Sequence, residues 1–383
     1  MRTIKRVPER PLDDRGLGPA SSQPDLSDHG AVVTERPARL SRGNTVALVF
    51  FFALLAVVVA GSLLKLPYAV MSPGPTVNTL GDSPGTTKPI ITVAGLPTYP
   101  TNGALKFTTV RVEGGPGYPV DVWGVLQAWV DPTQDVYPVD DLFDPQVSKE
   151  QVAQQNAVQM EGSQEEATVV ALRALGKPAP VAIGSFTPTS KAKGLLQVKD
   201  RFVTVGTTDI TTTESVRSAL QQVKPGTSVS VVVERSGTKV KVEVPTIAGY
   251  RGATALGIGL THDFPATVTL DAGAVGGPSA GLMFSLGIYD KLTPGALTAN
   301  HDVAGTGTID DAGKVGPIGG IKQKLAGARA GGAEYFLAPA DNCNEVVGHV
   351  PDGLSVFKVA TFDDGLKAVK AIAAGTTGDL PRC

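Results

Sequence analysis

The stretch that decides the fold is Gly276-Gly277-Pro278-Ser279-Ala280-Gly281, followed by apolar residues at helical spacing: Leu282, Met283, Leu286 and Tyr289. A serine framed by glycines and a proline at a helix start is exposed on a tight turn, and the helix N-terminus favours negative charge nearby. These properties suit a nucleophile, so Ser279 is the candidate catalytic residue. An ordinary helix start is the alternative, because proline and serine also mark such positions.

A serine nucleophile needs a base. The chain has four histidines, His29, His262, His301 and His349, and none lies in an HExxH frame. A Ser-His-Asp site with His262 or His301 stays open, because triads are assembled in space. The other candidate is Lys322, in the run Ile318-Gly319-Gly320-Ile321-Lys322-Gln323-Lys324-Leu325, where glycines precede a second helix. Its alternative is a solvated surface charge.

Lysine can act as a base only when it is neutral. The pKa of Lys322 would have to fall from about 10.4 toward 7 or 8, which corresponds to roughly 4 kcal/mol of desolvation. Ile318, Ile321 and Leu325 could supply the burial. Ser279 would then attack a carbonyl, Lys322 would pass the proton to the leaving amine, and backbone N–H groups near the glycines would hold the oxyanion.

Three segments together carry a family resemblance: residues 277–281 (GPSAG), 302–307 (DVAGTG) and 316–339 (GPIGGIKQKLAGARAGGAEYFLAP). In order and spacing they resemble the proteolytic domain of Lon proteases. The resemblance implies a Ser-Lys dyad of Ser279 and Lys322, with Thr306 as a polar partner of the lysine. Lys324, two residues on, is expected to point away.

Two positions depart from the Lon pattern. Many Lon enzymes have an acidic residue three positions before the serine, where this chain has Gly276. A glutamate common after the TG pair is replaced by Thr308. These changes bear on the substrate loops and leave the dyad intact.

Residues 181–247 form a compact unit of strand, helix and hairpin. A capping box at Thr211 and Glu214 predicts the helix, and Ser236-Gly237 predicts the hairpin turn. The order resembles the second half of a PDZ domain, with Lys199 where PDZ domains usually carry glycine. Residues 184–186 are the candidate carboxylate-binding loop, and a generic α+β insert is the alternative.

The N-terminal part predicts a membrane anchor. Residues 1–44 read as a disordered tail, and residues 45–64 form an uncharged run long enough to cross a bilayer. Arg36, Arg39 and Arg42 precede the run, which predicts a single-pass protein with a cytoplasmic tail and an extracytoplasmic body in the cell membrane. The alternatives are a buried helix and a cleaved signal peptide.

The remaining segments complete an α+β architecture. Residues 65–84 are predicted to be a linker and residues 85–180 an α+β region whose helix over 148–175 is broken or kinked near Gly162, with a second capping signal at Ser163. Residues 248–383 are the Lon-type domain. The 85–180 region resembles the front part of a Lon fold, which would make the PDZ-like unit an insertion.

Composition and motifs limit the partners and cofactors that are expected for this chain. The formal net charge of −2 offers no basic surface for phosphate backbones, which argues against nucleic acid. No GxxxxGK[ST] run occurs, so no ATP is expected, and no cofactor or metal motif is found. The only cysteines are Cys343 and Cys383. An oxidising compartment predicts that they form a disulfide, and two free thiols are the alternative.

The sequence therefore favours an ATP-independent, membrane-anchored serine endopeptidase that acts on protein or peptide substrates presented by a PDZ-like unit. An inactive membrane-tethered peptide-binding scaffold is the alternative, and a histidine-based hydrolase is a third possibility. The sequence leaves the oligomeric state open.

Overall fold

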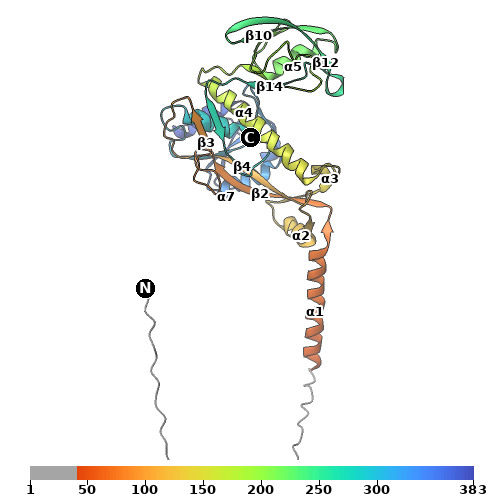
Figure 1. Ribbon diagram of the computed structural model, residues 1–383. Helices are drawn as coiled ribbons and strands as arrows, with labels where there is room; N and C mark the ends of the chain where they lie inside the picture. The colour runs from red at the N-terminus through yellow and green to blue at the C-terminus, as the bar shows by residue number, and fades with distance from the viewer. Residues whose placement is uncertain (1–40) are drawn as a thin grey trace, which may run out of the picture. The chain divides into compact units, whose positions relative to one another are not determined.

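The computed structural model describes residues 41–383 (Figure 1). The predicted disordered tail, Arg36, Arg39 and His29 therefore lie outside the described residues, apart from the last positions of the tail. The chain divides into two compact units, and the boundary between them lies between Ala56 and Val57. Helix α1 (Arg42–Leu63) is 22 residues long, predominantly apolar and without a buried residue, so by length and composition it could cross a membrane. Its bounds agree closely with the predicted span.

A six-stranded sheet organises the larger domain. The first four strands in its spatial order are parallel: β20 (Ser355–Val359), β19 (Tyr335–Pro339), β16 (Asp302–Gly305) and β4 (Ala104–Glu113). Strand β2 (Tyr68–Asn78) follows and is antiparallel to β4, and β6 (Asp135–Pro138) pairs antiparallel with β2. The predicted linker over residues 65–84 is therefore wrong, because most of it is strand β2, which pairs with β4.

Helices cover both faces of this sheet. Side chains alternate along a strand, so neighbours such as Val303 and Ala304 belong to different cores. One core joins the sheet to α4 (Lys149–Ala174), α6 (Gly281–Lys291) and α9 (Phe362–Ala373). The opposite core joins it to α7 (Ile321–Ala330).

Strands β3 (Ile91–Ala94) and β4, which precede the inserted unit in the sequence, belong to this larger domain. Strand β3 pairs with β15 (Thr267–Leu270), and β4 pairs with β16. The segment between α4 and β15 is therefore an insertion, the arrangement that the resemblance of residues 85–180 implied. Helix α4 runs unbroken from a capping box of Ser148 and Gln151, so the predicted break near Gly162 is wrong.

The inserted unit has its own sheet and core. Its sheet order is β11 (Thr238–Pro245), β10 (Ser228–Arg235), β8 (Arg201–Val205), β7 (Val181–Phe186) and β14 (Ile258–His262), with β9 (Thr208–Asp209) beside β8. Helix α5 (Thr213–Gln221) packs on it, and its N-cap is Thr212 rather than Thr211.

Two predictions for this unit need correction. Strand β14 belongs to its sheet, so the unit extends to His262 and not to residue 247. Residues 184–186 lie in β7, an inner strand, and are not a carboxylate-binding loop. Lys199 has φ +71°, a left-handed conformation that favours glycine.

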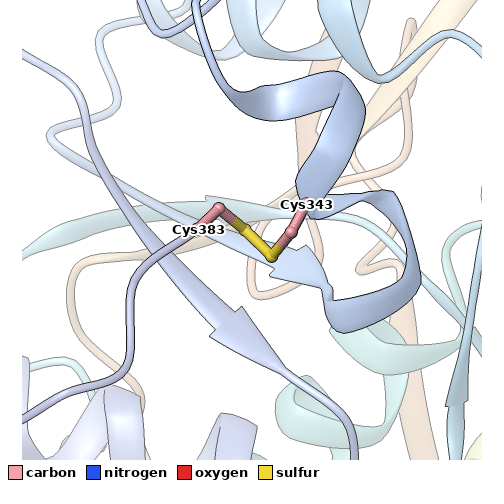
Figure 2. The surroundings of a disulfide bond; sticks show 2 residues. All are labelled: Cys343 and Cys383. Atoms are coloured by element: carbon pink, nitrogen blue, oxygen red, sulfur yellow. A yellow bond between two sulfur atoms is a disulfide. The ribbon is translucent and has the colours of Figure 1, made fainter.

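The C-terminus is tied back by a disulfide. Cys343 begins the short helix α8 (Cys343–Val346), and it is bonded to Cys383, with Cα atoms 4.8 Å apart (Figure 2). Arg382 bridges to Phe357 of β20, which brings the terminal residues alongside the sheet.

Candidate active site

Ser279 lies in the tight turn that precedes α6. Gly277 has φ +86°, and its N–H donates to the Asn156 carbonyl on α4 at 3.0 Å. The Ser163 hydroxyl, also on α4, donates to the Pro278 carbonyl at 2.9 Å. Ser163 was predicted to start a helix, but it instead fixes the serine loop from inside one. Helix α4 therefore holds the backbone on which Ser279 sits.

Lys324 is the lysine next to this serine. Its Nζ donates to Ser279 Oγ at 2.7 Å and to Thr306 Oγ1 at 2.9 Å. The Thr306 hydroxyl donates in turn to the Ser279 carbonyl at 3.0 Å. Lys324 is 2% exposed and Thr306 is fully buried. The three side chains form one connected group at the base of the serine loop.

Burial lowers the pKa of Lys324 to about 7. Removing an ammonium from water disfavours its charged form, so near neutral pH a large fraction of the side chain is an uncharged amine. An uncharged amine within hydrogen-bond distance of a hydroxyl can accept its proton, which is the geometry of a general base.

Lys322 does not reach this group, so its pairing with Ser279 and Thr306 is corrected. Its Nζ donates to Asp135 of β6, at 2.8 Å to Oδ1 and 3.1 Å to Oδ2, and its side chain is 30% exposed. The expectation that Lys324 points away is also wrong. Positions 321, 324, 325 and 328 share one helical face, and that face of α7 is buried. This spacing was the signal in the sequence that could have identified Lys324.

The two candidate histidines, His262 and His301, contact carboxylates and not Ser279. His262 Nδ1 lies 2.9 Å from Glu165 Oε1, and its Nε2 lies 3.3 Å from Asp311 Oδ2. His301 lies 3.5 Å from Glu334. Within residues 41–383 no histidine hydrogen bonds to Ser279, so the geometry does not support a Ser-His-Asp site.

The His262 cluster links the inserted unit to the larger domain. His262 ends β14, Glu165 lies on α4, and Asp311 also accepts from the Thr213 N–H at the start of α5. Burial alone would lower the pKa of His262, but hydrogen bonds to Asp311 and Glu165 outweigh it and raise that pKa. Burial, followed by the charges of Asp311 and Asp310, raises the pKa of Glu166 to about 7.

A cavity of about 510 Å³ opens beside Ser279 and Lys324. Strand β4 forms one wall: it pairs with β16 only as far as Phe107, and from Thr108 onward no strand in the described part of the chain pairs with that side. Met71 and Met160 add apolar lining. A Cβ on Gly276 would lie 2.8 Å from Asn156 Cβ, which explains why a side chain has no room there.

A second cavity, of about 1220 Å³, lies between α5 and β14 of the inserted unit, and Gly162, Glu165 and Glu166 of α4 also line it. Strand β14 is the end strand of its sheet among the residues the structure covers, so one edge of it is unpaired. Ile258, Leu260 and Leu220 line the space. Across residues 41–383 no group of three or more His, Cys, Asp or Glu side chains is placed to hold a metal ion.

Residues 259–371 match the model of the Lon protease (S16) C-terminal proteolytic domain, which confirms the expected resemblance. The chain is 36% identical over 152 residues to a Lon protease of Azospirillum brasilense, and 32% identical over 153 residues to Lon protease 1 of Sorangium cellulosum. These matches cover 37% and 38% of this chain but only 18% and 19% of the relatives, about a fifth of their length.

Among solved structures, the chain is similar to PDZ domains of SdrC-like proteins from two Listeria species. For Listeria innocua the identity is 16%, the coverage is 22% of this chain and 96% of that chain, and the TM-score is 0.21. For Listeria monocytogenes the identity is 15%, the coverage is 21% of this chain and 86% of that chain, and the TM-score is 0.20.

Proposed function

We propose that this chain is a serine endopeptidase in which Ser279 is the nucleophile, Lys324 the general base and Thr306 the residue that orients the lysine. The observation that carries the proposal is a buried lysine 2.7 Å from a serine hydroxyl on a glycine-rich turn. The match of residues 259–371 to a proteolytic domain supports the same chemistry.

The reaction follows from these positions. The uncharged Lys324 amine takes the hydroxyl proton as Ser279 Oγ bonds to the scissile carbonyl carbon, and the carbonyl electron pair moves onto the oxygen. Backbone N–H groups of the glycine-rich loop stabilise that oxyanion. The Lys324 ammonium then protonates the leaving amine as the C–N bond breaks. Water releases the acyl group by the same route, with Lys324 again accepting the proton.

Substrate is proposed to bind as an extended strand. Residues 108–111 of β4, which no strand pairs on the side of β16 in the described part of the chain, lie along the wall of the cavity that contains Ser279. A peptide that hydrogen bonds there would present its carbonyls at the level of the serine. The apolar lining from Met71 and Met160 favours an apolar side chain close to the scissile bond.

The inserted PDZ-like unit is proposed to select or deliver protein substrates. The unpaired edge of β14 and helix α5 bound the cavity of about 1220 Å³ that Ile258, Leu260 and Leu220 line, and an extended peptide segment would add there as a further strand. Loss of catalysis with retention of this groove would give the alternative function, a peptide-binding scaffold.

We further propose that α1 anchors the chain in the cell membrane, with the catalytic body on the extracytoplasmic side. The uncharged run over residues 45–64 and the arginines before it support this topology. The Cys343–Cys383 disulfide is consistent with an oxidising compartment. The peptidase step as written uses no nucleotide, and the chain carries no P-loop run.

A fluorophosphonate probe tests the proposal on the full chain purified in detergent. The wild type is expected to be labelled at Ser279, and Ser279→Ala should lose both the label and the cleavage of an unfolded protein, with and without ATP. Labelling of another residue, or cleavage retained in Ser279→Ala, would overturn the assignment. Binding of peptides without labelling or cleavage would favour the scaffold.

A further inference from the structure

Helix α2 (Val122–Val130, VWGVLQAWV) has no charged residue, and its exposed side is apolar apart from one polar residue, Gln127. Val125 and Ala128 are buried. The exposed apolar residues and their exposed fractions are Trp123 38%, Leu126 42%, Trp129 69% and Val130 82%. A helix in contact with water normally turns a polar face outward. In the part of the chain that the structure describes, the C-terminal end of this face, Trp129 and Val130, is left largely uncovered.

The position of α2 is fixed by its neighbours. Strand β1 (Lys65–Leu66) follows α1 almost directly and pairs with β5 (Val120–Asp121), which directly precedes α2. The Trp123 indole N–H donates to the Val58 carbonyl at 3.1 Å. A Cβ on Gly61 would lie 2.6 Å from Trp123 Nε1. Trp123 therefore lies against the last turns of α1.

These contacts give α2 a depth relative to the apolar run. At 1.5 Å per residue, Gly61 and Val58 lie about 4 to 9 Å inside the end of the run at Leu64. Amphipathic helices at a bilayer surface are buried about 5 to 10 Å, at the boundary between headgroups and acyl chains. A body that holds Trp123 at this level brings the rest of α2 to the same boundary.

We propose that α2 is a membrane-interface helix whose outward face, with Trp129 and Val130 at its C-terminal end, inserts into the headgroup–acyl boundary of the bilayer. The proposal rests on anchoring by α1. Tryptophan is enriched at this boundary because its ring is apolar and its N–H is polar. The helix itself carries no basic residue, so the partner is the apolar boundary of the bilayer and not an anionic headgroup. The contact would hold the catalytic body at the membrane surface.

The chain offers a direct reporter, because its only two tryptophans are Trp123 and Trp129. The Trp123→Phe variant of the full chain, reconstituted in phosphatidylcholine vesicles, leaves Trp129 as the single fluorophore. Lipids brominated near the carbonyl end of the acyl chain should quench its emission at least about twofold, and soluble acrylamide should quench it less than in denaturant. A matched control is Tyr250→Trp in the Trp123→Phe/Trp129→Phe background, since Tyr250 is 81% exposed on the inserted unit. That control should not respond to brominated lipid.

Each outcome has a distinct meaning. If alkaline carbonate extracts the protein from the vesicles, anchoring fails and the inference fails with it. If the protein resists extraction but Trp129 stays accessible to acrylamide and insensitive to brominated lipid, the inference alone is overturned. Emission that is shielded without lipid quenching, and that becomes exposed when the protein is diluted in the vesicles, would assign the face to a second copy of the chain and would equally overturn it.

Discussion

Lys322 and Lys324 are two residues apart on α7, yet their ammonium groups bind on different sides of the helix, one to Asp135 and the other to Ser279. Successive positions on a helix are about 100° apart, so residues i and i+2 face away from each other. The sequence correctly predicts that the two lysines point in opposite directions. The prediction that Lys322 is the one that faces Ser279 is wrong. The pair therefore provides a matched test within one helical turn.

Lys324→Ala is expected to reduce kcat/KM for peptide cleavage by at least about 1,000-fold, because it removes the base from the serine. Lys322→Ala should retain activity within about tenfold, since it loses only a partly exposed ion pair with Asp135. Peptidase assays of both purified variants, with thermal melts to check folding, make the measurement. The reverse order of effects would restore Lys322 as the base.

The pH dependence should report the pKa of Lys324. Because that pKa is lowered to about 7 and only the uncharged amine can accept the proton, kcat/KM should rise with pH through about 7 and then level. Lys322→Ala should show the same profile. A profile without this rise between about pH 6 and 9, with chemistry shown to be rate-limiting by single-turnover kinetics, would contradict lysine as the base.

A charge in the groove of the inserted unit should affect large substrates selectively. Ile258→Arg is expected to lower kcat/KM for an unfolded protein by about tenfold while leaving a short peptide unchanged, because Ile258 lines the cavity between α5 and β14. Val198→Arg is the control, since Val198 is 51% exposed and lies outside that lining. Equal losses on both substrates would indicate a structural role for the unit.

Removal of the disulfide should lower stability without removing the site. The Cys343→Ser/Cys383→Ser variant is expected to lose about 3 to 4 kcal/mol of unfolding free energy in the loop-entropy model, because the bond closes a 40-residue separation. Urea unfolding with and without reductant measures it: reductant should shift the wild-type curve to that of the variant. Two reactive thiols in the denatured, unreduced wild type would contradict the bond.

Glu166 should make stability fall as pH rises. Its folded pKa is raised to about 7 against 4.5, so between these values the folded state binds more protons than the unfolded state, and unfolding free energy decreases with pH. The difference in unfolding free energy between Glu166→Gln and the wild type should therefore shift in favour of the variant by about 1 to 2 kcal/mol from pH 5 to pH 8, after allowance for solvent screening. Urea titrations at the two pH values decide it, and a difference that does not change with pH would refute the shift.

The sequence by itself determined the features that are local. The uncharged run predicts α1, the Ser236-Gly237 turn predicts the β10–β11 hairpin, and the glycine-framed Ser279 stands out as the proposed nucleophile, because each depends on neighbouring residues and backbone preference. The likeness to the Lon proteolytic domain also came from contiguous motifs.

Tertiary structure decided what depends on distant pairing. Strand β2 looked like a linker because its prolines and glycine carry no strand signal, and only pairing with β4 makes it a strand. Strand β14 joins the inserted unit through β7, more than 70 residues earlier in the sequence. The choice between Lys322 and Lys324 depended on which face of α7 packs on the sheet, because burial lowers the lysine pKa and only the packed side is buried.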